Sequence, residues 1–193
     1  MPNYCNYSME ISGKPADIDE FVKIIQADYK YKDGICNVER HLWRVFSADA
    51  YDEKISNGIK TTCVSGDCAW SVSSCMTGEG YQADYPDRNG TTLQEESKRL
   101  NLAIEVYSEE PGVGFMEHYL YIDGEEIYNE CVDWNEYWPD DFDSVEEMNE
   151  ECGTNFTLEE FESGDRLETG GFDWDFGVWK TANSTTLNIE EII

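Results

Sequence analysis

The stretch "DWNEYWPDDFDSVEEMNEE", from Asp133 to Glu151, combines repeated carboxylates with large aromatic side chains and contains no lysine or arginine. Carboxylates at regular spacing suggest calcium, and an EF-hand loop needs alternating oxygen ligands, glycine at its sixth position and glutamate at its twelfth. From Asp141 the sixth residue is Glu146, and from Asp173 the alternation fails at Gly177. The sequence therefore predicts no specific metal site and no cofactor.

Catalytic residues are not identifiable from the acidic residues or the histidines by type and spacing. Glycoside hydrolysis needs two carboxylates at a set separation, and the 42 Asp and Glu residues of the chain do not single out a pair. The two histidines, His41 and His118, lie in no nucleophile motif. One enzymatic alternative stays open: a small hydrolase or nucleotide-handling enzyme that uses Glu109, Glu110 or His118 around the glycines of "PGVGF", a segment that otherwise reads as a tight hairpin turn.

The seven cysteines indicate reduced thiols. Their number is odd, and the chain shows no basic and apolar leader segment and no apolar run near the ~18 residues of a membrane helix. Cys63, Cys68 and Cys75 lack the tight Cys-x-x-Cys spacing of zinc sites, so we expect them to act as small buried hydrophobic residues. These features predict a cytoplasmic protein.

Charge restricts the possible partners most strongly. The chain has 42 acidic and 13 basic residues, for a net charge of −29. Residues 1–100 hold 11 basic and 16 acidic side chains, whereas residues 101–193 hold 2 basic and 26 acidic ones. Such a field repels nucleic acid and anionic lipid and attracts basic surfaces. We therefore expect no direct nucleic-acid binding, no membrane binding, and a basic protein partner.

The acidic half should be folded, because a disordered acidic tail would be depleted in aromatic residues. A helix beginning at Ser144 would hold two glutamate pairs at i, i+4, and each pair costs roughly 0.2 to 0.5 kcal/mol. One interpretation is a solvated surface that maintains solubility; the other is a rigid polyanion mimic that occupies a basic nucleic-acid channel. On the second interpretation, the partner-binding residues are Asp133, Trp134, Glu136, Tyr137, Trp138, Asp140, Asp141, Asp143, Glu146, Glu147, Glu150, Glu151, Glu159, Glu160 and Glu162.

Hydrophobic patterning indicates the elements that would position these residues. "YCNYSMEISG" alternates like a strand, and "KPADIDEFVKIIQADY" has apolar residues at helical spacing after Pro15. A further strand is expected at residues 42–48, and a strand or hairpin at residues 59–73, interrupted at residues 65–67. Thr92, with Glu95 three positions on, predicts the cap of a second helix.

In the second half, "LAIEVYSEE" and "MEHYLYIDGEEIYNECVDW" read as strands, with a hairpin turn at Asp123-Gly124. We expect the last strand to end at Trp138 and a turn to follow at residues 139–143. After the turn we expect helices capped by Ser144 and Thr157, and a strand in "GGFDWDFGVW". This order predicts an α+β fold, a ferredoxin-like antiparallel sheet covered on one face by two helices. Residues 1–132 would form this core, and residues 133–193 an acidic, aromatic-rich α/β extension packed on it.

Several motifs carry a family resemblance. The start "MPNYCN" with Ser12-Gly13, the central Ala69-Trp70-Ser71, and "YSEEPGVGFMEHYLYIDGE" from Tyr107 to Glu125 resemble the YubB-type ferredoxin-like family of plasmids and phages. The similarity covers roughly residues 1–130, and the acidic second half is similar to anti-defence proteins of the anti-CRISPR type. The resemblance implies a ferredoxin-like fold and a mobile-element origin, and it implies no catalytic residues.

These observations lead to one principal functional expectation. The chain is expected to be a non-enzymatic inhibitor of the anti-CRISPR or anti-restriction type that binds a CRISPR effector or nuclease in the cytoplasm of a bacterial host. The hydrolase described above is the alternative, and an interaction module for plasmid maintenance is a third possibility.

Overall fold

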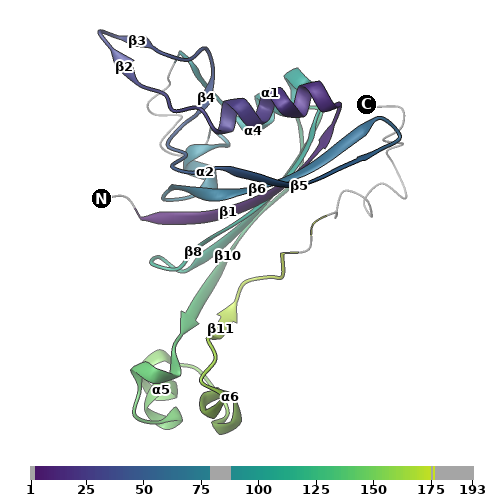
Figure 1. The fold of residues 1–193 in the computed structure, drawn as a ribbon. Coiled ribbons are helices and arrows are strands. Elements are labelled where there is room, and N and C mark those ends of the chain that lie inside the picture. Colours follow the sequence, from purple (N-terminus) through teal and green to yellow (C-terminus); the bar gives the residue numbers. More distant parts are fainter. Residues whose placement is uncertain (1–2, 79–87, 175, 177–193) are drawn as a thin grey trace.

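The computed structural model describes residues 3–78, 88–174 and 176, and it is a mixed α+β protein built on a large antiparallel sheet (Figure 1). The seven strands of this sheet lie in the order β11-β10-β9-β8-β1-β6-β5, and every neighbouring pair is antiparallel. In chain order the elements are β1 (Tyr4–Gly13), α1 (Pro15–Ile25), β2 (Tyr31–Lys32), β3 (Ile35–Cys36), β4 (His41–Leu42), β5 (Asp49–Ser56), β6 (Ile59–Ala69), α2 (Val72–Cys75), β7 (Gly90–Thr91), α4 (Leu93–Leu100), β8 (Ala103–Glu110), β9 (Phe115–Ile122), β10 (Glu125–Tyr137), a 3-10 turn (Pro139–Asp141), α5 (Val145–Cys152), α6 (Leu158–Ser163) and β11 (Leu167–Gly170).

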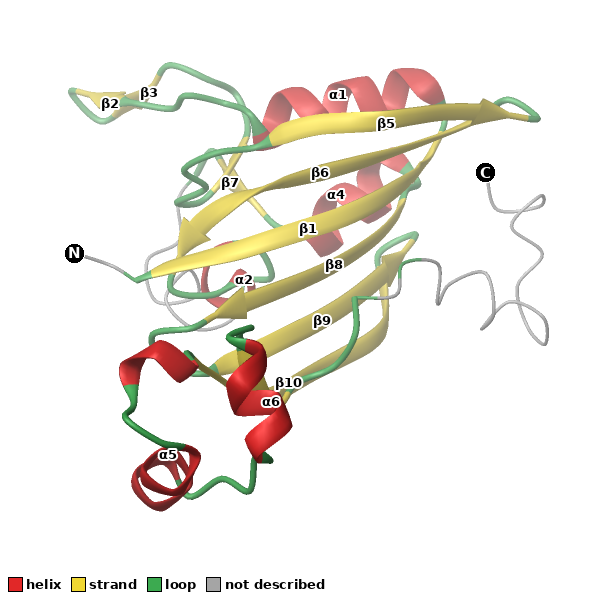
Figure 2. Cartoon of the chain, turned by 60° about the horizontal axis from the view of Figure 1, so that its bottom comes forward, coloured by secondary structure: helices red, strands yellow, loops and turns green. Residues whose placement is uncertain are grey.

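The hydrophobic core lies between the sheet and the helices α1 and α4, on what we call the helix face (Figure 2). On α1, Ile18, Phe21 and Ile25 point toward the sheet, as their helical spacing predicts. Alternate residues of β1, among them Met9 and Ile11, meet them from the sheet side and are fully buried.

The helix α4 begins at the predicted cap. The Thr92 side chain accepts a hydrogen bond from the Glu95 amide, and the Glu95 carboxylate accepts one from the Thr92 amide, which completes a capping box. The Glu96 side chain is fully buried beside this cap, where Arg40 and Arg99 donate hydrogen bonds to it. This ion-pair network ties the segment before β4 to α4.

Strands β8, β9 and β10 form an antiparallel meander joined by two tight turns. Residues 111–114 connect β8 to β9, and Asp123-Gly124 connects β9 to β10 as predicted. Gly114 has a φ of +88°, and a Cβ there would lie 2.8 Å from the Trp134 carbonyl oxygen. The glycine-rich segment "PGVGF" is thus a hairpin connection whose backbone approaches β10 closely.

The sheet face opposite α1 and α4, called here the open face, carries Tyr107 and His118. Residues 171–174 lie over this face, and Phe172 and Trp174 lie against the Tyr107 ring. No strand is present at residues 171–174, so the prediction of a strand in "GGFDWDFGVW" is wrong there, and its end at residues 177–179 lies outside the described residues.

Two other strand predictions are wrong. Instead of a strand at residues 42–48, only His41–Leu42 forms one, because Arg44 adopts a left-handed conformation with φ +51°. The expected interruption of residues 59–73 at residues 65–67 is absent, since β6 runs continuously from Ile59 to Ala69, and the end of the expected range belongs to α2 (Val72–Cys75) instead of a strand. Its hairpin partner is β5, which the sequence pattern did not indicate.

Candidate partner-binding surface

The end of β10 leads into an acidic lobe, defined here as residues 139–166, which contains the 3-10 turn, α5 and α6. Figure 1 shows α5 and α6 projecting beyond the end of the sheet. Ser144 caps α5 as predicted, because its hydroxyl accepts a hydrogen bond from the Glu147 amide at 3.2 Å. The Glu147 carboxylate in turn accepts one from the Asp143 amide at 2.8 Å, and Gly153, with φ +69°, ends the helix.

The link between α5 and α6 is held by one amide side chain. Asn149 Nδ2 donates to the Phe156 carbonyl at 2.8 Å, while Asn149 Oδ1 accepts from the Phe156 amide at 2.8 Å and from the Thr154 hydroxyl at 2.7 Å. Thr157 then caps α6 through a capping box with Glu160. Hydrogen bonds from Thr157 lower the pKa of Glu160, which therefore stays ionised.

The lobe packs on the sheet through few apolar side chains. Val145 and Met148 are buried on the inner side of α5, and the Tyr137 ring meets the Phe156 ring edge-on with centroids 5.7 Å apart. Helix α6 has no buried residue. The glutamates of both helices are therefore turned toward solvent on an ordered backbone.

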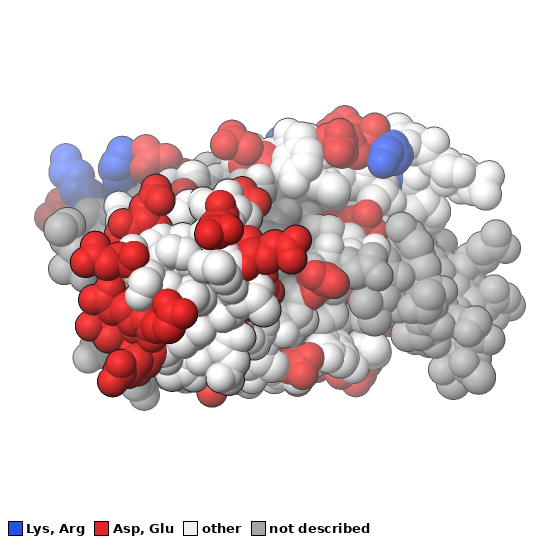
Figure 3. Space-filling view, turned by 90° about the horizontal axis from the view of Figure 1, so that it is seen from below, with Lys and Arg blue, Asp and Glu red and all other residues white. Residues whose placement is uncertain are grey.

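Twelve of the fifteen expected partner-binding residues are exposed. Eleven of them are acidic, and the twelfth is Trp138, whose side chain is 49% exposed. Figure 3, seen from the side of the acidic lobe, shows clusters of acidic side chains, whereas Lys and Arg appear only near the upper margin. The exposed members are Asp133, Trp138, Asp140, Asp141, Asp143, Glu146, Glu147, Glu150, Glu151, Glu159, Glu160 and Glu162.

The other three expected residues are not exposed to solvent in the same way: one is buried and two are half-buried. Trp134 is 1% exposed and forms part of the joint between β10 and β11, so its side chain offers no surface to a partner. Glu136 and Tyr137 are half-buried. Leu158, which the sequence did not single out, is 57% exposed at the start of α6 and adds an apolar group to the acidic lobe.

The one basic residue between positions 101 and 176 is Arg166. Its guanidinium lies 3.2 Å from Glu136 Oε2, pairs with Glu168, and sits over the Trp134 ring at 5.7 Å from the centroid. Arg166 is thus engaged by acidic and aromatic neighbours and does not neutralise the glutamates of α5 and α6.

The residues of the alternative enzyme are divided between the two faces of the sheet: Glu109 shares the open face with His118, and Glu110 points to the helix face. Glu110 is 2% exposed and accepts hydrogen bonds from the Gly112 and Val113 amides of its own turn. His118 lies on the open face beside Glu105, and Glu109 pairs in register with Met116. Because successive residues of a strand point to opposite faces, Glu110 and Glu109 themselves diverge.

A hollow of about 300 Å³ beside the glycine turn is lined instead by Glu117, Cys131 and three serines, with four other residues. Glu117 accepts hydrogen bonds from the Val72 amide and the Ser108 hydroxyl, both at 2.8 Å. Its carboxylate therefore holds α2 to the sheet. No local pattern indicates this role, because Glu117 and Val72 are 45 positions apart.

Metal binding finds no support in the described residues, where no three His, Cys, Asp or Glu side chains form a group that could hold an ion. Cys68 and Cys75 are buried in the core as expected, whereas Cys63 lies outside it and is half-buried. No helix in the described ranges is long and apolar enough to cross a membrane.

Comparison of the chain with known proteins finds no matching family model, no matching curated protein and no matching solved structure. The YubB-type resemblance and the anti-CRISPR-like character of the second half therefore remain predictions from the sequence. Any functional proposal has to be built on the geometry described above.

Proposed function

We propose that the chain is a non-enzymatic inhibitor from a phage or related mobile element that binds a basic host protein through its acidic lobe. The partner would be a nucleic-acid-handling protein of the bacterial cytoplasm, such as a CRISPR effector or a restriction nuclease. The observation that carries the proposal is the set of eleven exposed carboxylates between Asp133 and Glu162, seven of them on the capped helices α5 and α6, with Arg166 already engaged.

The rigidity of the lobe supports mimicry over a purely electrostatic tail. Caps at Ser144 and Thr157 and the bridge through Asn149 fix the directions of α5 and α6, so little conformational entropy is lost on binding. The exposed Trp138 can serve as an apolar anchor, because tryptophan is frequent among the residues that dominate interface energies. The carboxylates around Trp138 would then occupy the basic channel of the partner, in the positions that the phosphates of a nucleic acid take.

We further propose that β1, α1, β5, β6, α4 and β8 form a ferredoxin-like unit. Two features support this: the chain order strand, helix, strand, strand, helix, strand, and the spatial order β8-β1-β6-β5. Strands β9 to β11 would then extend the unit on one side and carry the acidic lobe. The expected boundary at residue 132 falls inside β10, which runs unbroken from Glu125 to Tyr137.

The experiment that tests the function is capture of proteins from a bacterial lysate on the immobilised full chain, at low and at high salt. Nucleic-acid-binding proteins should be retained at low salt, released by salt, and displaced by added DNA or RNA. The Glu146→Lys/Glu150→Lys variant should lose them. The matched control, Glu39→Lys/Glu125→Lys, has the same net charge and should keep them, since both control residues are exposed and lie outside the lobe.

A partner that binds the α5 variant as well as the unchanged chain would contradict the proposal. So would a partner that stays bound when nucleic acid is added in excess.

A further inference from the structure

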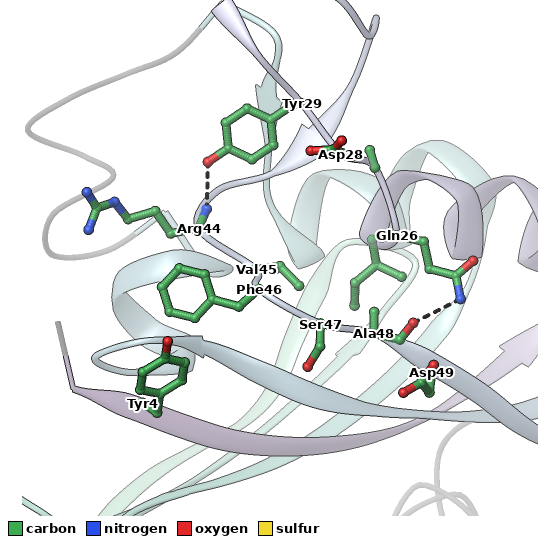
Figure 4. A pocket seen from close by; sticks show the side chains of 12 residues that line it. Tyr4, Gln26, Asp28, Tyr29, Arg44, Val45, Phe46, Ser47, Ala48 and Asp49 are labelled. Atoms are coloured by element: carbon green, nitrogen blue, oxygen red, sulfur yellow. Dashed lines mark hydrogen bonds between the residues drawn. The ribbon is translucent and has the colours of Figure 1, made fainter. Parts of the chain in front are cut away.

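A pocket of about 890 Å³ lies between the end of α1 and segment 44–49, which leads into β5 (Figure 4). Its volume is in the range of sites that bind small ligands. It shares no residue with the acidic lobe. The lining residues are Tyr4, Ile25, Gln26, Ala27, Asp28, Tyr29, Arg44, Val45, Phe46, Ser47, Ala48 and Asp49.

One wall of the pocket, segment 44–49, is fixed to the sheet at several points. The Phe46 amide donates to the Asp67 carbonyl at 2.8 Å, the Ser47 hydroxyl donates to the Asp67 carboxylate at 2.9 Å, and the Tyr7 hydroxyl donates to the Ser47 carbonyl at 2.8 Å. Burial raises the pKa of Tyr7, so this hydroxyl keeps the proton that it donates. The pocket is therefore formed before any ligand arrives, which lowers the entropic cost of binding.

Three aromatic side chains line the pocket: Tyr4, Tyr29 and Phe46. Tyr4 and Phe46 lie with ring centroids 5.1 Å apart and are 61% and 47% exposed. Tyr29 lies across the pocket from Tyr4 (Figure 4) and is held in place because its ring stacks on His41 and its hydroxyl accepts the Arg44 amide at 2.9 Å. Adjacent exposed aromatics beside a cavity are typical of a surface that a partner covers.

The charged groups at the pocket are arranged to favour a cation. Asp28 and Asp49 lie on opposite sides of the pocket in Figure 4, whereas the Arg44 side chain extends away from its centre. The Arg44 guanidinium is held 4.7 Å from the centroid of the Trp70 ring and 5.1 Å from that of Trp43. The Asp28 carboxylate pairs with the Lys30 ammonium at 2.7 Å, so a cation can approach this side of the pocket. Because the pair is exposed and therefore weak, a cation from a partner can replace Lys30.

We propose that this pocket binds the side chain of an arginine from a partner polypeptide. A guanidinium is planar, stacks on aromatic faces such as those of Tyr4 and Phe46, and donates two parallel hydrogen bonds to one carboxylate; Asp49 is a carboxylate that lines the same pocket. The strongly acidic chain raises the local concentration of such cationic segments. This site does not depend on the function proposed for the acidic lobe.

The test is calorimetric titration of the full chain with the blocked peptide acetyl-Gly-Arg-Gly-amide. Its counterpart with citrulline in place of arginine has nearly the same shape and no charge. The arginine peptide should bind and the citrulline peptide should not. Asp49→Asn, which preserves shape, and Phe46→Ala should each weaken binding by about tenfold, the effect of losing one charge-assisted hydrogen bond or cation–π contact.

Two control variants separate the pocket from general attraction by the acidic chain. Glu39→Gln removes an exposed carboxylate outside the pocket and should leave the affinity unchanged. Glu146→Lys/Glu150→Lys, which disables the acidic lobe, should also leave it nearly unchanged. The proposal is overturned if the arginine peptide does not bind, if the citrulline peptide binds equally well, if Asp49→Asn and Phe46→Ala are silent, or if the α5 variant loses as much affinity as Asp49→Asn.

Discussion

His118 on β9 and Glu105 on β8 form a hydrogen-bonded pair inside the protein, with His118 Nε2 3.0 Å from Glu105 Oε1. Glu105 is fully buried, and His118 is 5% exposed. The Tyr107 ring stacks on the imidazole with centroids 4.0 Å apart, and Trp174 stacks on the Tyr107 ring at 6.1 Å. The pair therefore lies under an aromatic cover on the open face, and each polar group compensates for the burial of the other.

Removal of one member of this pair should cost more than removal of both. His118→Leu leaves the Glu105 carboxylate buried without the imidazole, and we expect the free energy of unfolding to fall by about 3 kcal/mol. Glu105→Leu/His118→Leu replaces both groups by apolar ones and should recover part of that loss. Urea unfolding of the unchanged chain, both single variants and the double variant measures the coupling; strictly additive effects would contradict a compensating pair.

Gly66→Ala on β6 should displace segment 44–49, which forms one wall of the arginine pocket. A Cβ at Gly66 would lie 2.0 Å from the Ser47 carbonyl oxygen, so segment 44–49 must move away from β6. We expect a loss of about 1 to 3 kcal/mol of stability, as for other overpacked sites, together with weaker binding of the arginine peptide. The neighbouring Ser65→Ala inserts no new atom and serves as the control. Unchanged peptide affinity in folded Gly66→Ala would show that the wall position does not matter.

Local signals predicted the starts of four helices but not that of α2, which begins inside the strand expected at residues 59–73. Thr92, Ser144 and Thr157 all cap helices in the structure, because a cap depends on a side chain and an amide only three residues away. The hairpin at Asp123-Gly124 was predictable for the same reason. By contrast, β5 is exposed along its whole length, so no alternation of apolar and polar residues marks it.

Features that depend on contacts distant in sequence were missed or misread. Gly66 suggested a break in the strand, whereas it permits the close approach of Ser47 to an intact β6. The apolar composition of residues 42–48 suggested a strand, but these residues form a pocket wall after the left-handed turn at Arg44. The burial of Trp134 and the pairing of Glu105 with His118 follow from strand register, which the sequence alone did not fix.

Acid should weaken the network around Glu96 in a defined pH range. Burial acts to raise the pKa of the Glu96 carboxyl, but hydrogen bonds from Arg99 and Thr91 and the charge of Arg40 outweigh it and hold the pKa below the ordinary 4.5. A folded-state pKa below the unfolded value gives stability that is complete above about pH 4.5 and is lost as the pH falls through the folded pKa.

We therefore expect Glu96→Gln to be less stable than the unchanged chain near neutral pH, and the difference to shrink as the pH is lowered below about 4.5. Urea unfolding of both proteins over a pH series measures this difference directly. Since both carry nearly the same surface charge, relief of general repulsion at low pH cancels in the comparison. A difference that stays constant across the series would mean that Glu96 is not held ionised by its partners.

The glutamates of α5 should lower the stability of the helix and strengthen the binding of a basic partner. Glu146 and Glu150 are both exposed and one helical turn apart, so Glu150→Lys changes a repulsive pair into an attractive one and places a cation near the end of the helix. We expect unfolding to become harder by about 0.5 to 1 kcal/mol, as measured by urea denaturation. The same variant should bind the basic partner more weakly.

Glu125→Lys, at the opposite end of β10, is the control: it makes the same change in net charge and should alter neither the stability nor the binding appreciably. Opposite effects of Glu150→Lys on stability and on binding would indicate that the repulsion within α5 is retained for recognition, because folding alone would favour the lysine.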